Sequence, residues 1–330
     1  MFAACGDDGG GGTSTHKDAA VDSPRPIDAA VDAPLDAPKV YMDAMWPMAH
    51  HHYVLDRVLL PNTNTQARAY GLDLNGDMTV DNQLGMVFST LAGMGFDNQT
   101  PMTQAIDKGT AIMLADINAD ALSTAPFAAF TIYQGANPMP PACSSPSDIV
   151  CRKHLTGSGS FSLKANAPVD PALQGSISGT GTLVAGPGHL TIQVSMLGSV
   201  PATVTLIGAR VELMPTATSF MGKLGGGVSM SDINTKVLPA MRDGVAIAVA
   251  RDCTMLMSPP ACGCAADTTG KTMLGLFDTT PKDCMVTLAE IQNNSLIQAL
   301  FAPDVTLENQ MALSLGVSVG AVKGMFTAPM

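Results

Sequence analysis

The sequence contains little charge and no long apolar run. Charged residues make up 14% of its 330 residues, well below the rough quarter of typical soluble domains. No apolar stretch reaches the ~20 residues that a membrane-spanning helix needs. The net charge is −11 and no basic patch is present, which argues against nucleic-acid partners. Low charge with abundant Gly, Ser, Thr and Ala favours a β-rich extracytoplasmic protein over a cytosolic enzyme.

Signatures of catalysis are also missing. No Gly-x-Ser-x-Gly occurs. Residues 265–272 formally match a phosphate loop, but Cys262 and Cys264 precede them where a buried strand is required, so we expect no nucleotide partner. No carboxylate pair stands out for glycosidase chemistry. We therefore favour a non-enzymatic protein, and the alternative is a secreted hydrolase whose site assembles only in three dimensions around His154 or His189.

The seven cysteines divide into one and six. Cys5 stands alone near the N-terminus, and the other six are Cys143, Cys151, Cys253, Cys262, Cys264 and Cys284. An even number of cysteines predicts three disulfides in an oxidising compartment. Cys143 and Cys151 close a short loop and form the predicted first pair, while the last four allow three connectivities. Zinc binding at the 262–264 pair is the alternative, but a second close Cys or His pair at zinc spacing is missing.

The N-terminal region indicates an anchor and a spacer. Residues 1–5 resemble the end of a bacterial lipoprotein signal, with Cys5 as the lipidated residue; the alternative is a stray thiol. Residues 6–45 are rich in Gly, Asp, Ala and Pro, a composition that buries too little to fold and predicts a disordered tether. We expect this tether to hold the remainder of the chain off a bacterial envelope membrane.

Residues 46–330 are expected to form a single disulfide-bonded α+β domain that is mainly β. Strand-length runs separated by Gly or Pro turns predict a large antiparallel meander sheet packed with a few helices. The runs lie at 53–60, 111–115, 127–133, 161–163, 175–184, 189–197, 203–213, 220–228 and 311–323. Apolar residues at helical spacing predict helices after residues 82, 100, 231 and 287.

The most specific motif is an oxygen-rich loop that runs straight into the first predicted helix. Side chains with oxygen occur at every second position, namely Asp73, Asn75, Asp77, Thr79 and Asp81. A hard cation such as Ca²⁺ takes six to eight oxygens, so the spacing predicts a calcium site. The loop resembles an EF-hand or dockerin loop, with Met78 in place of the turn glycine and Leu84 in place of the final glutamate. The alternative is an Asx-rich turn that caps the following helix.

Three further polar clusters are weaker candidates. A second segment matches the calcium-loop spacing less well, with candidate ligands Asp278, Asp283, Thr287 and Glu290. The alternative there is a disulfide-tied turn followed by a capping box. Residues 50–52 are three consecutive histidines with no carboxylate nearby in sequence, and we expect an exposed polar turn rather than a metal site. Asp116, Asn118 and Asp120 are expected in a turn at a strand end.

Taken with Cys5 and the Asp/Ala/Pro tether, the motifs in residues 73–85 and 290–298 resemble surface lipoproteins of myxobacteria. The resemblance implies placement on the cell envelope, at the outer membrane or cell surface, with the membrane as partner through a lipid anchor. The expected function is a calcium-stabilised binding or structural module for an envelope or extracellular ligand. A second alternative is a β-sheet that holds a lipid, suggested by the long run of strands and the 22 Met residues.

Overall fold

The computed structural model describes residues 48–145, 148, 151–194, 201–253, 259, 261–279 and 281–328. Cys5, the signal remnant and the tether of residues 6–45 lie outside these ranges, so their predicted roles concern residues that the structure does not describe. Within the described part, no helix combines the length and apolar character needed to cross a membrane.

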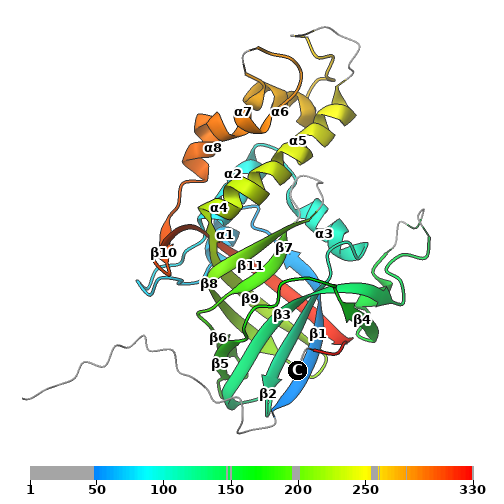
Figure 1. Ribbon diagram of the computed structural model, residues 1–330, viewed down its shortest axis with the longest axis vertical. Coiled ribbons are helices and arrows are strands. Elements are labelled where there is room, and N and C mark those ends of the chain that lie inside the picture. Colours follow the sequence, from blue (N-terminus) through cyan, green and yellow to red (C-terminus); the bar gives the residue numbers. More distant parts are fainter. Residues whose placement is uncertain are drawn as a thin grey trace, which may run out of the picture. The chain divides into compact units, whose positions relative to one another are not determined.

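The described chain is mainly β, as expected, with helices at one end (Figure 1). The strands are β1 Ala49–Leu59, β2 Met113–Ala119, β3 Ala125–Met139, β4 Gly159–Leu163, β5 Leu173–Ile177, β6 Leu183–Ala185, β7 Leu190–Val194, β8 Ala202–Pro215, β9 Ser219–Ser229, β10 Val305–Leu307 and β11 Gln310–Met325. The helices are α1 Asn64–Tyr70, α2 Gln83–Gly93, α3 Gln99–Asp107, α4 Met230–Asp232, α5 Leu238–Asp252, α6 Thr269–Phe277, α7 Leu288–Asn293 and α8 Ser295–Leu300, with short η1 Lys153–Leu155 and η2 Ile233–Val237.

The sheet closes into a barrel rather than remaining an open meander. Antiparallel pairs run β1-β2-β3-β5-β6-β8-β9-β11 and back to β1. Two pairings close the ring: β11 returns from the end of the chain to pair with β1, and β3 pairs with β5 as well as with β4. The predicted strands were mostly correct, but the predicted open meander was wrong. A closed barrel is favoured physically because it leaves fewer unpaired strand edges than an open sheet.

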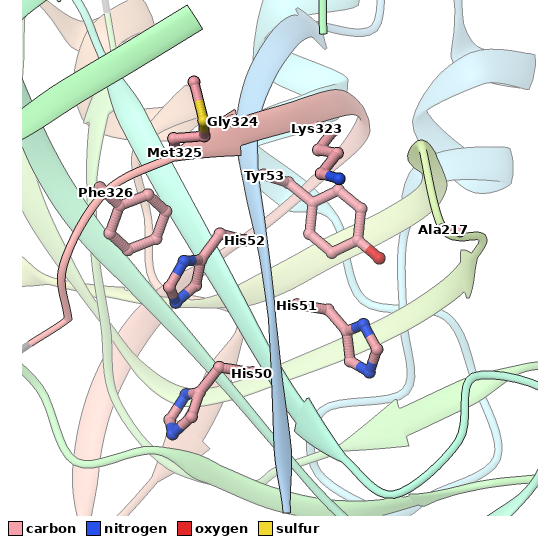
Figure 2. A pocket seen from close by; sticks show the side chains of 9 residues that line it. All are labelled: His50, His51, His52, Tyr53, Ala217, Lys323, Gly324, Met325 and Phe326. Atoms are coloured by element: carbon pink, nitrogen blue, oxygen red, sulfur yellow. The ribbon is translucent and has the colours of Figure 1, made fainter. Parts of the chain in front are cut away.

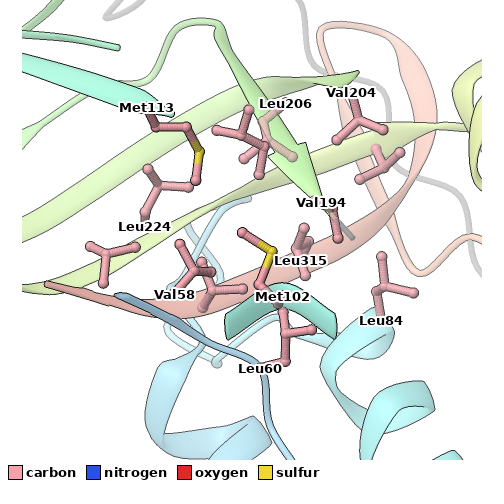
Figure 3. Close-up of a cluster of buried hydrophobic side chains, with 14 of the residues drawn as sticks. Val58, Leu60, Leu84, Met102, Met113, Val194, Val204, Leu206, Leu224 and Leu315 are labelled. Atoms are coloured by element: carbon pink, nitrogen blue, oxygen red, sulfur yellow. The ribbon is translucent and has the colours of Figure 1, made fainter. Parts of the chain in front are cut away.

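Side chains fill the barrel interior. Strand residues alternate between the two faces, and Tyr53, Phe130 and Phe220 point inward from three strands. The Phe220 ring lies 5.1 Å from the Tyr53 ring and 6.3 Å from the Phe130 ring, edge to face in both cases. Toward the other end, Met102 of α3 joins a cluster of strand side chains (Figure 3).

The loop and helix that follow α1 are fastened to β11 by one buried amide. Asn82 caps α2 by accepting the Gly85 N–H, and the same oxygen accepts the Gly316 N–H of β11 at 2.7 Å. Its amide nitrogen donates to the Ala67 and Gly316 carbonyls. A Cβ at Gly316 would lie 2.7 Å from the Gly71 Cα, so only glycine permits this close approach of the two chains.

Three disulfides are present, as predicted. Cys143 pairs with Cys151, at a sequence separation of 8. The connectivity that the sequence left open is Cys253–Cys264 and Cys262–Cys284. The last two bridges tie the end of α5 and the segment before α7 to one short loop. Helix α5 packs on both α6 and α7 in this region (Figure 1).

Candidate functional site

The three consecutive histidines form part of strand β1, so the expected polar turn was wrong. Residues 49–54 pair with β2 in continuous antiparallel register, from Ala49 opposite Ala119 to Val54 opposite Leu114. Alternation along the strand places His50 and His52 on one face and His51 on the other, together with Tyr53. Figure 2 shows the His50 and His52 rings on one side of β1 and the His51 ring on the opposite side.

The carboxylate that the sequence seemed to lack comes from the neighbouring strand. Asp116 lies opposite His52 in the ladder and Asn118 lies opposite His50, so neither belongs to the expected strand-end turn. The Asp116 Oδ2 atom is 2.7 Å from His50 Nδ1, and its Oδ1 atom is 3.7 Å from His52 Nε2. One donor atom from each of His50, His52 and Asp116 lies within 4.8 Å of the others.

Burial increases across this cluster from His50 to Asp116. The side chains of His50, His52 and Asp116 are 52%, 25% and 6% exposed. Burial lowers the pKa of His52, with smaller contributions from His50 and His51, and Asp116 opposes that shift. Nearby, burial and then the Asp116 charge raise the pKa of Tyr133. His52 is thereby favoured as a neutral imidazole, the form that ligates metals.

Two buried atoms of the cluster lack a hydrogen-bond partner among the described residues. They are His52 Nε2 and Asp116 Oδ1. An unpaired buried polar atom typically costs about 1–3 kcal/mol. The two atoms face each other across 3.7 Å, and an ion bound between them would satisfy both. The Phe326 ring stacks on the His52 ring at 4.3 Å and fixes its orientation.

A pocket of about 360 Å³ adjoins the cluster (Figure 2). It is lined by His50, His51, His52, Tyr53, Ala217, Lys323, Gly324, Met325 and Phe326. The pocket forms where β11 leaves β1. Strand β11 pairs with β1 as far as Tyr53 opposite Lys323, and its next residues, Gly324 and Met325, run parallel to β4 instead. The described ladder of the histidine stretch is therefore with β2 alone.

The donor types decide which ions suit this cluster. Imidazole nitrogen suits zinc, copper and nickel, whereas calcium takes oxygen ligands in larger number. Two imidazoles and one carboxylate, held at adjacent ladder positions of two strands, form a partial shell for a transition metal. Sequence reasoning missed Asp116 because it lies 66 residues from His50. Two sequence patterns could have indicated the cluster: the His-x-His spacing in β1 and the Asp-x-Asn spacing in β2, each of which places polar side chains on one face of its strand.

The predicted calcium residues lie in the exposed loop between α1 and α2. Asp73 accepts N–H groups from Gly76 and Met78 at 2.7 and 3.0 Å, and Asp77 accepts the N–H and the hydroxyl of Thr79. Met78 adopts a left-handed conformation, with φ of 66°, which the glycine of an EF-hand would adopt more easily.

Asp81 and Asn75 complete this loop in the same manner. Asp81 Oδ2 accepts the Leu74 N–H at 2.8 Å, and Asn75 Oδ1 accepts the Asp77 N–H at 3.0 Å. Together with the Asn82 cap, these bonds form the Asx-rich helix-capping turn that was the alternative reading. Calcium binding by the loop stays a prediction.

The second candidate loop is organised around backbone donors as well. Asp278 accepts the N–H groups of Asp283 and Cys284 at 3.3 and 3.0 Å. Thr287 and Glu290 form the capping box of α7 that the alternative reading predicted.

The remaining sequence candidates are dispersed over the described chain. His154 is buried and meets the Phe161 ring edge to face at 6.1 Å, whereas His189 is exposed and paired with Glu308 at 2.8 Å. At the start of α6, Gly270 donates its N–H to Asp252 at 2.9 Å. A carboxylate thus occupies the position that a phosphate would take in such a loop.

Comparison with known proteins adds no assignment to this geometry. The chain matches no protein-family model, no curated protein and no solved structure.

Proposed function

We propose that this chain is an envelope-anchored, non-enzymatic protein whose barrel binds a divalent transition-metal ion. The observation that carries the proposal is the convergence of His50, His52 and Asp116 within 4.8 Å at the edge of a pocket. Zinc and copper are the ions that best suit two imidazoles and a carboxylate.

Placement on the envelope is supported by the cysteines. Six of the seven are paired in three disulfides, which persist in oxidising compartments. Cys5 is the one cysteine outside these pairs, at the position where the lipoprotein motif predicts the anchor. The Asp-rich tether would then hold the barrel and its metal site away from the membrane surface.

The metal site is tested by replacing each histidine in turn. After treatment with a chelator and its removal, calorimetric titration with Zn²⁺ or Cu²⁺ should give one site in the wild-type protein. His50→Ala, His52→Ala and Asp116→Ala should each weaken binding by at least about 100-fold, since loss of a ligand exceeds the 10–100-fold typical of a supporting residue.

His51→Ala is the matched control. It removes an imidazole from the same triplet but from the opposite face of β1, so metal affinity should stay unchanged. Equal losses for all three histidines would indicate capture by a flexible triplet and would overturn the proposal. Circular dichroism of each variant shows whether the barrel has remained folded.

A separate experiment tests the calcium loop. If Asp73, Asn75 and Asp77 hold Ca²⁺, the melting temperature should rise with calcium and fall again with a calcium-selective chelator. A ligand at 100 times its dissociation constant adds about 2.7 kcal/mol to the free energy of unfolding. Asp77→Ala should remove this response, whereas Asp283→Ala in the second loop should retain it. A wild-type protein that melts at the same temperature with and without calcium would refute the prediction.

A further inference from the structure

We infer that the metal at His50, His52 and Asp116 keeps a coordination position open to the adjoining pocket, and that a small carboxylate with an apolar group binds there. This inference rests on the proposed metal site and adds the chemical class of the molecule that the site takes.

The open position follows from the number and placement of the donors. The described His, Cys, Asp and Glu residues supply three donors at this site, whereas zinc and cobalt ions take at least four ligands. Asp116 is the buried member, and both imidazoles line the pocket. The protein therefore encloses the ion from the side of the two strands, and the fourth ligand enters from the pocket.

The charge of the surroundings favours an anion as that ligand. A divalent ion with two neutral imidazoles and one carboxylate keeps a net positive charge. The described lining of the pocket contains no Asp or Glu, and its cation, Lys323, lies opposite Tyr53 in the ladder, on the other face of β1 from the His50 and His52 rings. A carboxylate entering this space would meet the positive charge of the ion and no carboxylate of the described pocket wall.

The size and surface of the pocket restrict the rest of the molecule. About 360 Å³ lies near the lower end of the range for small-molecule sites. The Phe326 ring supplies apolar surface beside His52, on which it stacks. An aromatic monocarboxylate such as benzoate fits these requirements of charge and surface, and it is the probe for the test.

Asn118 is the protein group that would close the site instead. It lies opposite His50 in the ladder, and its Oδ1 atom is buried without a hydrogen-bond partner among the described residues. If Asn118 supplied the fourth ligand, an added carboxylate would have no position to take.

The test uses the protein loaded with Co²⁺, whose visible spectrum reports its ligands. Benzoate should change this spectrum saturably, and benzamide, which has the same shape without the charge, should not. Lys323→Gln is the control for a non-specific charge effect, and it should change benzoate binding by less than about twofold, since Lys323 lies on the other face of β1 from the proposed metal ligands. The same variant should leave Co²⁺ affinity within about twofold, since Lys323 is not a metal ligand.

The possible results separate the two proposals. A protein that binds no Co²⁺ refutes the metal site itself. A protein that binds Co²⁺ but shows no spectral response to benzoate keeps the metal site and overturns the open position, and a response that appears only in Asn118→Ala identifies Asn118 as the closing ligand. Equal responses to benzoate and benzamide would overturn the preference for an anion.

Discussion

Replacing Asn82 with alanine is expected to lower the free energy of unfolding by about 3–5 kcal/mol, because four backbone groups lose their partner at once. The Asn82 side chain is buried and bonds Ala67, Gly85 and both the N–H and the carbonyl of Gly316. These groups belong to α1, α2 and β11. Alanine would leave them buried without partners and leave a small cavity beside them.

Asn75→Ala is the matched control for this prediction. Asn75 lies in the same loop but is exposed, and its described bonds stay within the loop. Its replacement should cost less than about 1 kcal/mol, as is usual for surface sites. Denaturation of both variants in urea measures the difference, and a similar small loss for both would show that Asn82 acts as an ordinary helix cap.

Asn82 also shows which part of the fold was readable from the sequence. Its role as a cap is local, and the sequence offered a capping Asx-rich turn before this helix as the alternative to a calcium site. Its bonds to Gly316 span 234 residues, and no local pattern specifies them. The same division holds elsewhere: the capping box at Thr287 and the strand-length runs were predicted, because each depends on neighbours in sequence.

The barrel and its candidate site depend on contacts that sequence patterns do not record. Closure requires β1 and β11, from opposite ends of the chain, to pair. The His50 and His52 rings gain their carboxylate only through the register of β1 against β2. The prediction for the histidines was wrong because it considered only carboxylates close to them in sequence. Asp116 is instead a neighbour on the adjacent strand, where paired side chains lie about 5 Å apart.

Replacing Phe220 with alanine is expected to lower the free energy of unfolding by about 3–5 kcal/mol, the usual cost of truncating a buried phenylalanine. The Phe220 ring is 2% exposed and contacts the rings of Tyr53 and Phe130 inside the barrel. The Tyr53 hydroxyl is itself fixed by donating to the Thr216 carbonyl at 2.7 Å. These neighbours belong to a closed ring of strands, which limits how far they can collapse into the space that is left.

Met221→Ala is the natural comparison, because Met221 is the next residue of β9 and points outward, 51% exposed. Its loss should change the free energy of unfolding by less than about 1 kcal/mol. The contrast also bears on the lipid-holding alternative. A barrel whose interior accommodates an acyl chain would tolerate a smaller residue at Phe220, whereas a barrel filled by its own side chains would not. A loss at Phe220 no larger than at Met221 would therefore refute the packed interior and favour a barrel that carries a lipid.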